Sequence, residues 1–539
     1  MLSRLHRLHR LHAAARRAPL EAALVLVVVA SCAYVIVAPL AACRYPPISD
    51  LPLHGAGASV FRHYLDPDFH FREQFRLQPL ASPYVSLYAI GAALMLVLPP
   101  LTATKAAVGI MLALLPAGMA VLFWGMKRSP LLGVLGLGVV WGNLTHWGFI
   151  NFVGALGVFC AAVGLALRLV DRPTPARGAA LALTLIALFF THVYRFPFAI
   201  CAVLGAALLA YPATGRLRPI LLPLLPALLL FIVWLLIRSD ALRADTGPLR
   251  IHPERLRELP DALFSSFHDP RESKAFLRAG QLLLAALGVT VAARLVEPRP
   301  ARLVEPRARR FTAAATAVPL ACAAVFLGCF LVLPMEMGVW WYVYPREATT
   351  ALLLALGAFP DLPTTRWLRA SVVLTLAAAA IPLTGVVVDN YRRFDAATED
   401  FHAITRDIPQ APKLLYLIFD HQGSTRTTTP FVHLPAWVQA ERGGWLSFHF
   451  VLLGTPPFVY RDPGEPGAVV PPPVPLRWEW TPQRFDVRKH GAFFDWFLIR
   501  NVTDPSRMLR ADPAIEQVSR VGTWWLYRRR AGEQRGVFE

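Results

Sequence analysis

Residues 21–43, EAALVLVVVASCAYVIVAPLAAC, form an apolar run that is followed directly by the polar, aromatic and charged stretch 44–83. The run is long enough to cross a bilayer, which takes about 20 apolar residues, and too long for the core of a cleaved signal peptide. Further apolar runs follow, so we expect the first one to be retained as a membrane-spanning helix. The stretch 44–83 is then a long loop on one side of a membrane.

The composition indicates a membrane protein with several crossings. Hydrophobic residues make up 55% of the 539 residues, and many long runs carry almost no charge, which predicts transmembrane helices rather than a globular core. The net charge of +19 comes largely from Arg residues in the segments between these runs. This pattern is typical of loops that orient a membrane protein, and we expect no nucleic-acid partner. The cysteines lie in or beside apolar runs, so no disulfide framework is predicted.

The charge pattern also predicts which side each loop faces. The tail 1–20 is basic and contains no acid, which predicts a cytoplasmic N-terminus and a first loop outside. Its RLH triplets resemble low-complexity basic sequence more than a metal-binding tract. The run Tyr84–Leu98 is short for a crossing and is ended by Pro99-Pro100, so we predict that it lies along the outer membrane surface.

With Tyr84–Leu98 on the surface, every later Arg cluster falls on the cytoplasmic side; if it crossed, all of them would lie outside. The predicted crossings lie near residues 21–43, 104–125, 130–143, 148–169, 178–193, 197–211, 219–237, 277–293, 312–333, 346–360 and 368–389. The predicted cytoplasmic loops lie at residues 127–128, 168–177, 216–218, 294–310 and 361–369.

The region from Asn390 onward is too polar and too rich in proline to cross the membrane. Its strand-like runs LLYLIFD, WLSFHFVLL, FFDWFLIRNV and GTWWLYRRR alternate with Pro/Gly segments and predict a small α/β domain outside the membrane. The expected fold is therefore an α-helical polytopic membrane protein with about eleven transmembrane helices, a membrane-surface helix and a C-terminal α/β soluble domain. The predicted divisions are a tail 1–20, a membrane domain 21–389 with first outer loop 44–103 and surface helix 84–98, and a C-terminal domain 390–539.

Asp50 is the leading candidate for chemistry in the first loop. A carboxylate near the membrane boundary, in a partly desolvated cleft, has a raised pKa and can act as a general base. The alternative is that Asp50 caps a helix starting at Leu51, since Pro52 suits a first helical turn. His54 comes four residues later, on the same face of such a helix, and the pair suits a proton relay or a shared divalent cation. Whether a metal binds stays open.

A second acidic cluster, Asp66-Pro67-Asp68 with His70, follows in the same loop. Asp-Pro pairs commonly start turns, which gives the cluster a structural interpretation. The functional alternative is that Asp66 and Asp68 orient an acceptor hydroxyl or a cation, with His70 as a further contact.

Further candidates lie at the outer ends of predicted crossings. Arg195 in THVYRFP and Arg346 in WWYVYPRE are both on the side where positive charge is disfavoured, and a guanidinium there matches a lipid phosphate bidentately. For Arg346, an ion pair with Glu347 is the alternative. Aromatic and solvent-exposed side chains are common at the membrane–water interface and need no function there. Three such residues are nevertheless candidate contacts for the acceptor or a cation: His146, His192 and Tyr344.

Together these features resemble the GT-C superfamily of polytopic glycosyltransferases. The match rests on Asp50 soon after the first helix, the surface segment SPYVSLYAIGAALMLVLPP and the region from Asn390. The string GFINFVGALGVFCAAVGLALRL, with THVYRFPF after it, is also similar to bacterial membrane proteins of this architecture. Members with the strongest pattern carry an adjacent Asp-Glu pair in the loop, where this chain has Asp50-Leu51.

The resemblance implies transfer of a sugar from a polyprenyl-phosphate donor to a glycan, lipid or protein acceptor at the outer face of the cytoplasmic membrane. Asp50 would deprotonate the acceptor hydroxyl, and an Arg would stabilise the departing phosphate. The absent Asp-Glu pair leaves a non-catalytic assembly or binding protein as an alternative. A transporter of lipid-linked substrate is a third possibility, although the sequence has few mid-span charges and no clear two-fold repeat.

Overall fold

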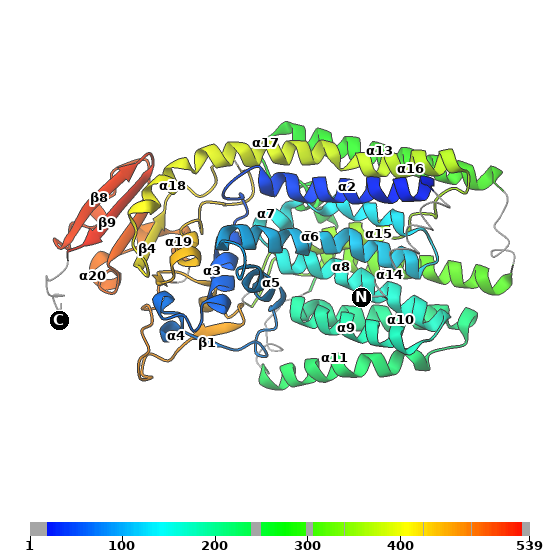
Figure 1. The fold of residues 1–539 in the computed structure, drawn as a ribbon, viewed down its shortest axis with the longest axis horizontal. Helices are drawn as coiled ribbons and strands as arrows, with labels where there is room; N and C mark the ends of the chain where they lie inside the picture. The colour runs from blue at the N-terminus through cyan, green and yellow to red at the C-terminus, as the bar shows by residue number, and fades with distance from the viewer. Residues whose placement is uncertain are drawn as a thin grey trace.

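The computed structural model describes residues 19–238, 249–297 and 305–530, apart from 339, 424 and 476. The RLH repeats of the tail and residues 298–304 of the predicted loop 294–310 lie outside the described residues. The described chain forms a long helical bundle with a small sheet at one end (Figure 1).

Eight helical segments among the described residues are long and apolar enough to span a membrane by length and composition. They are α2 (Pro19–Ala41), α6 (Pro100–Gly125), α8 (Ile150–Asp171), α10 (Phe196–Thr214) with the 3-10 turn η3 (Val193–Arg195), α11 (Arg218–Ile237), α13 (Pro270–Val296), α14 (Pro306–Val332), and α16 (Arg366–Ala379) joined to α17 (Ile381–Ala397). The other three predicted crossings are also helical but shorter: η2 (Pro130–Val139), α9 (Pro175–Thr191) and α15 (Pro345–Leu356).

The core of the bundle lies around α8, which is almost entirely buried. It crosses α6 so closely that a Cβ on Gly157 would lie 2.0 Å from the carbonyl oxygen of Leu114. Glycine lets two backbones approach in this way, which favours helix association in a membrane. The glycines in the sequence of α8 therefore explain why α6 and α8 form the centre of the fold.

The loops predicted to be cytoplasmic meet at one end of the bundle. Lys127, Arg172, Arg216 and Arg307 all line one cavity of about 370 Å³. At the same end of the bundle, Glu21 in the first turn of α2 forms an ion pair with Arg369 of α16. The basic segments therefore lie together, as the charge pattern predicted.

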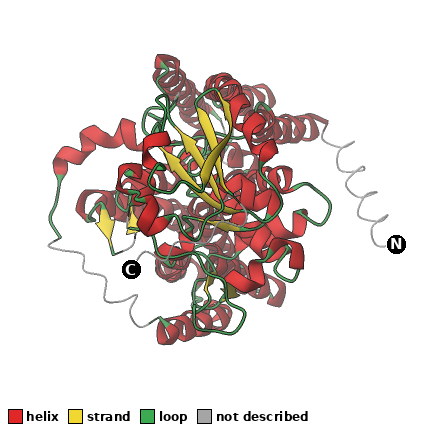
Figure 2. Cartoon of the chain, turned by 90° about the vertical axis from the view of Figure 1, so that its left-hand side faces the viewer, coloured by secondary structure: helices red, strands yellow, loops and turns green. Residues whose placement is uncertain are grey.

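The first loop lies at the opposite end, together with the C-terminal region (Figures 1 and 2). Its elements are α3 (Leu51–Arg62), η1 (Pro67–Phe69), α4 (Phe71–Gln74), β1 (Phe75–Leu77) and α5 (Ser86–Leu94). α5 has nine residues, or about 13 Å at 1.5 Å per residue, and is too short to cross a core of about 30 Å. The segment predicted to lie on the surface is therefore helical and non-spanning, but shorter than 84–98.

The first loop contacts the C-terminal region at several places. β1 pairs antiparallel with β6 (Phe458–Tyr460), and α3 packs on α19 (Ala436–Arg442). At this packing, a Cβ on Gly55 would lie 2.5 Å from the ring of Trp437.

The C-terminal region contains a five-stranded mixed sheet with the order β5-β4-β7-β9-β8. β4 (Lys413–Ile418) is parallel to β5 (Trp445–Leu446) and β7 (Trp496–Arg500), and β9 (Trp524–Arg529) is antiparallel to β7 and β8 (Ile515–Val521). The predicted run WLSFHFVLL forms a strand over only its first two residues. The predicted domain boundary at 389/390 falls inside α17, which continues toward α18 (Glu399–Ile404), and the division into domains stays a prediction.

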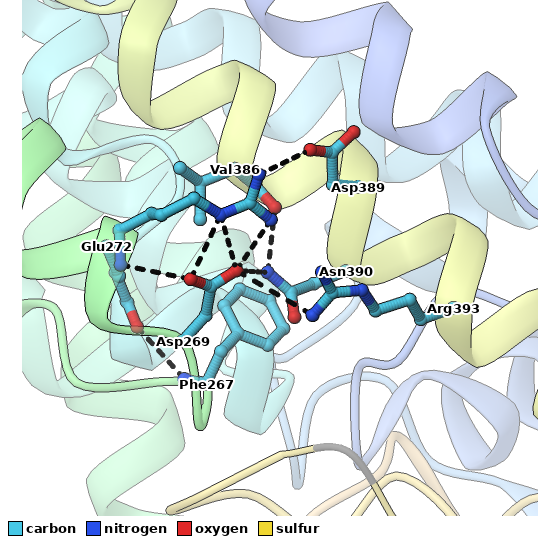
Figure 3. A network of polar contacts seen from close by, with 8 residues as sticks. Phe267, Asp269, Glu272, Val386, Asp389, Asn390 and Arg393 are labelled. Carbon is cyan, nitrogen blue, oxygen red and sulfur yellow. Dashed lines mark hydrogen bonds and ion pairs between the residues drawn. The ribbon is translucent and has the colours of Figure 1, made fainter.

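Asp269 ties the start of α13 to α17 (Figure 3). Its carboxylate accepts hydrogen bonds from the backbone N–H of Arg271 at 3.0 Å, from the Arg271 guanidinium and from Asn390 Nδ2 at 3.1 Å. These bonds, with that from the Arg271 side chain first, hold the pKa of Asp269 well below its usual range. The charged carboxylate therefore stabilises the fold above the ordinary carboxyl pKa, and this contribution is lost as the pH falls through the lowered value.

We expect Asp269→Ala to destabilise the protein by about 1–3 kcal/mol, because buried donors lose a charged acceptor. The measurement is the thermal unfolding midpoint of the full chain in detergent at neutral pH. Asp389→Ala is the matched control, since Asp389 pairs with the same Arg271 at 2.9 Å but is exposed, and should cost about 0–1 kcal/mol. Equal shifts in the two variants would contradict this assignment.

Candidate active site

Asp50 is held in place by the segment 146–149, which lies between η2 and α8. The backbone N–H groups of Ser49 and Asp50 donate to the carbonyl oxygens of His146 at 2.9 Å and Trp147 at 3.2 Å. Gly148 follows with a φ of +100°, and a Cβ there would lie 2.5 Å from the Cβ of Asp50. The glycine thus allows this segment to pass directly against Asp50.

The carboxylate of Asp50 is not used for helix capping. Asp50 occupies the N-cap position of α3, but its side chain makes no capping hydrogen bond. Pro52, in the first turn, has no N–H to offer. Burial raises the pKa of Asp50 to about 7, and the positive charge of Arg346 opposes this rise. A carboxyl group with this pKa can accept a proton near neutral pH, as general-base chemistry requires.

His54 does not form the predicted side-chain pair with Asp50. Its Nδ1 lies 3.1 Å from the hydroxyl of Tyr88, and its Nε2 lies 3.1 Å from the carbonyl oxygen of Gly148. Burial lowers the pKa of His54 to about 4, so the imidazole is neutral at pH 7. Both nitrogens are engaged, and the described part of the chain contains no group of three or more His, Cys, Asp or Glu residues placed to hold a metal ion. We therefore assign no step to a cation.

Arg346 is the residue whose positive charge acts on the Asp50 carboxylate. Its Nε and Nη2 donate to the carbonyl oxygens of Tyr342 at 3.0 Å and Trp341 at 2.7 Å, and its guanidinium carbon lies 3.9 Å from the ring centroid of Phe149. Within the described residues it has no carboxylate in ion-pair range, because the neighbouring Glu347 pairs with Arg195 instead. The predicted alternative, an Arg346–Glu347 pair, is therefore not formed.

Arg195 is buried and its charge is balanced by Glu347. Its guanidinium carbon lies 4.4 Å from the ring centroid of Phe152, 5.0 Å from that of Phe326 and 5.6 Å from that of Phe198. Its Nη1 is buried without a hydrogen-bond partner among the described residues, but Glu347 already balances the charge of the guanidinium, which weakens its attraction for an additional anion. Of the two predicted phosphate ligands, Arg346 is therefore the better candidate.

An apolar groove of about 190 Å³ runs between α10 and α14, with Phe159 of α8 among its lining residues. Phe198 and Phe326 line the groove and also contact Arg195, so the groove starts at the level of the Arg195–Glu347 pair. From there it follows α10 as far as Leu209, within the predicted span. The Arg346 guanidinium carbon lies 5.8 Å from the ring centroid of Phe152, which Arg195 also contacts, so the groove begins near both arginines and suits an amphipathic ligand with an anionic head.

Comparison with solved structures identifies the fold. The crystal structure of ArnT from Cupriavidus metallidurans bound to undecaprenyl phosphate matches with a TM-score of 0.50 and 13% identity, over 94% of this chain and 98% of that chain. The chain has the fold of a GT-C membrane glycosyltransferase. It is an integral, polytopic membrane protein.

Two further structures are similar. The apo crystal structure of the same ArnT has a TM-score of 0.47 and 13% identity, over 94% of this chain and 98% of that chain. The cryo-EM structure of the mycobacterial arabinofuranosyltransferase AftD has a TM-score of 0.45 and 14% identity, over 93% of this chain and 41% of that chain. No protein-family model and no curated protein sequence matches the chain.

Within this GT-C fold, Asp66, Asp68 and His70 lie at the other end of α3 from Asp50. The helix has twelve residues, so its ends are about 18 Å apart. Asp66 accepts from the backbone N–H of Asp68 at 3.2 Å and contacts His63, while His70 pairs with Glu73 at 2.6 Å. These local contacts are typical of a turn. Since α3 separates the cluster from Asp50, no observation supports the functional alternative for Asp66, Asp68 and His70.

His146, His192 and Tyr344 make packing contacts in the same fold. The His146 ring packs edge-on against Phe267, with 4.8 Å between centroids, and the His192 ring packs edge-on against Tyr84 at 5.0 Å. Tyr344 donates to Glu258 at 2.6 Å. His146 Nε2 and His192 Nδ1 are buried without a hydrogen-bond partner among the described residues, and a functional role for these three residues stays a prediction.

The sequence interpretation missed His433, which the structure brings to Asp50. Its Nε2 lies 3.9 Å from Asp50 Oδ1. A single histidine in a C-terminal segment has no spacing signal that relates it to the first loop. The strong apolar pattern around it, FVHLPAW, indicated only that the segment would be buried.

Proposed function

We propose that the chain transfers a sugar from a polyprenyl-phosphate donor to an acceptor hydroxyl, at the outer face of the cytoplasmic membrane. The observation that carries the proposal is the Asp50 carboxyl, which makes no capping bond and whose pKa is raised to about 7 by burial, against the opposing charge of Arg346. The proposed orientation, with the N-terminus cytoplasmic and the C-terminal region outside, is supported by the basic residues gathered at the far end of the bundle.

The donor is proposed to bind with its phosphate at Arg346 and its lipid tail in the groove between α10 and α14. Arg346 is a half-buried cation with no carboxylate in ion-pair range among the described residues, and guanidinium groups bind phosphate through paired N–H donors. The groove supplies an apolar path that begins at Phe198 and Phe326. The ArnT structure with the same fold was determined with undecaprenyl phosphate bound, which supports a ligand of this class.

The proposed reaction needs one base and one cationic group. The acceptor oxygen attacks C1 of the donor sugar from the face opposite the phosphate, and Asp50 takes the hydroxyl proton. The bond between C1 and the phosphate oxygen breaks, and its electron pair leaves with polyprenyl phosphate, so the configuration at C1 inverts. Arg346 stabilises the charge on that leaving group. A phosphate is already a good leaving group, so no acid is required on its side.

The pH dependence of transfer tests the assignment of the base. We expect the rate to rise with pH along a limb whose midpoint is near 7, because Asp50 must be deprotonated to accept the proton. The measurement is the initial rate of glycan formation in proteoliposomes between about pH 5 and about pH 9, with a panel of polyprenyl-phosphate sugars. A rate that is independent of pH through this range would count against Asp50 as the base.

A further inference from the structure

The C-terminal region covers the start of α3, where Asp50 lies. The backbone N–H of Thr429 donates to Ser49 Oγ at 2.9 Å, one residue before Asp50. Trp437 of α19 packs against Gly55, one turn into the same helix. The segment between these contacts is therefore fixed on both sides against the first loop, and His433 lies within it.

His433 is held in one orientation by aromatic packing. Its ring is buried and stacks on Phe448, with centroids 5.3 Å apart and planes 6° from parallel, and packs edge-on against Phe450 at 5.6 Å. In this orientation Nε2 faces Asp50 Oδ1 at 3.9 Å, while Nδ1 is buried without a hydrogen-bond partner. A buried imidazole needs at least one partner, and Asp50 is the carboxylate within reach.

The other titratable and charged groups near this contact are His54, Tyr88, Arg346, His421 and His449. His54 and Tyr88 bond to each other, and Arg346 contributes positive charge from α15. His449 receives the N–H of Val451 at its Nδ1. Burial lowers the pKa of His433 and of His449 to about 3, so both rings are neutral at pH 7. At that pH, His433 can act toward Asp50 as a neutral N–H donor.

We propose that His433 is a positioning residue, through which the C-terminal region orients the Asp50 carboxylate and stabilises its deprotonated form by an Nε2–H···Oδ1 contact. The inference rests on the proposed function of Asp50. The separation of 3.9 Å is longer than a hydrogen bond, and contacts of this kind in active sites commonly tighten when the substrate binds. The base is then complete only when the C-terminal region is seated on the first loop.

The test follows the ionisation of Asp50 directly. Dicyclohexylcarbodiimide reacts with protonated carboxyl groups in apolar surroundings, so the pH dependence of its addition to Asp50 in the full chain in nanodiscs reports when the group ionises. Peptide mass spectrometry gives the extent of labelling, and Asp50→Asn identifies the labelled site. In His433→Phe the ring still stacks on Phe448 but offers no donor, and we expect the labelling midpoint to move up by about 0.5–1 pH unit.

His433→Gln, which keeps an N–H donor, is expected to retain the original midpoint. His449→Phe is the matched control, because it changes a neighbouring buried imidazole without removing the group facing Asp50, and should leave the midpoint unchanged. An unchanged midpoint in His433→Phe, or an equal shift in His449→Phe, overturns the proposal. His433→Leu provides the same test should the Phe variant not fold.

Turnover separates this inference from the proposed function. If both hold, His433→Phe lowers kcat for transfer and moves its pH limb upward by the labelling shift, with little change in the KM for donor. If Asp50→Asn retains transfer while the labelling midpoint still depends on His433, the proposed base is wrong and the contact between His433 and Asp50 stands. If Asp50→Asn abolishes transfer and the labelling midpoint is unchanged in His433→Phe, only the positioning role of His433 is wrong.

Discussion

Asp50→Asn is expected to lower the rate of sugar transfer by about 10²–10⁴-fold, because an amide cannot take the proton of the acceptor hydroxyl. The substitution preserves the size of the side chain and its place at the start of α3, where the Asp50 side chain makes no capping bond that could be lost. The measurement is product formation by the purified protein in proteoliposomes. Retained transfer would remove Asp50 as the base.

Stability measurements distinguish loss of chemistry from loss of fold. Burial raises the folded-state pKa of Asp50 above its ordinary value, so the penalty for burying its charge develops as the pH rises toward about 7 and is fully present above it. Asn carries no charge, and the variant should therefore unfold at pH 8 at a temperature no lower than the unaltered protein. Asp66→Asn, in the same loop but at the far end of α3, is the matched control and should change transfer little.

Arg346→Gln is expected to weaken donor binding by about 10–100-fold, because a charge-assisted contact to phosphate is lost. The effect should appear in the KM for the polyprenyl-phosphate donor and in direct binding of polyprenyl phosphate, with the KM for acceptor little changed. Equal weakening of donor and acceptor would count against a phosphate contact.

Two other arginines sharpen this measurement. Arg255 donates to the carbonyl oxygens of Phe330 and Leu333 and packs on Tyr344, so Arg255→Gln tests loss of a similar guanidinium outside the candidate site and should leave donor binding unchanged. Arg195→Gln should instead lower stability, by about 3–5 kcal/mol, because it leaves Glu347 buried and unpaired. Loss of donor binding without loss of stability is therefore expected for Arg346 alone among the three.

The membrane part of the fold was largely predictable because its determinants are local. Each predicted apolar run is helical, and the Arg-rich loops do gather at one end. The run 84–98 was short and ended by two prolines, and its helix α5 is indeed non-spanning. The short 3-10 segment η2 differs from its predicted crossing because glycines such as Gly136 bring its backbone against that of α6.

Two residues of the candidate site, Asp50 in the first loop and Arg346 at the end of a predicted crossing, could be singled out from the sequence. The place of Asp50 soon after the first helix was sufficient to make it a candidate. That its side chain makes no capping hydrogen bond depends on three-dimensional packing. The pairing of Glu347 with Arg195 rather than with its neighbour Arg346 joins α15 to the start of α10, and nothing in the local sequence specifies it. His433 reaches Asp50 only because the C-terminal region folds back onto α3. This contact joins distant segments of the chain, and no sequence motif predicts it.

A cryo-EM structure of the full chain in nanodiscs with undecaprenyl phosphate tests the central claim most directly. The proposed site predicts that the phosphate lies within about 3 Å of the Arg346 guanidinium, on the side that faces Asp50, and that the lipid chain follows the groove between α10 and α14. A phosphate bound at the opposite end of the bundle, near Lys127 and Arg216, or a lipid chain outside the α10–α14 groove, would contradict the proposed site.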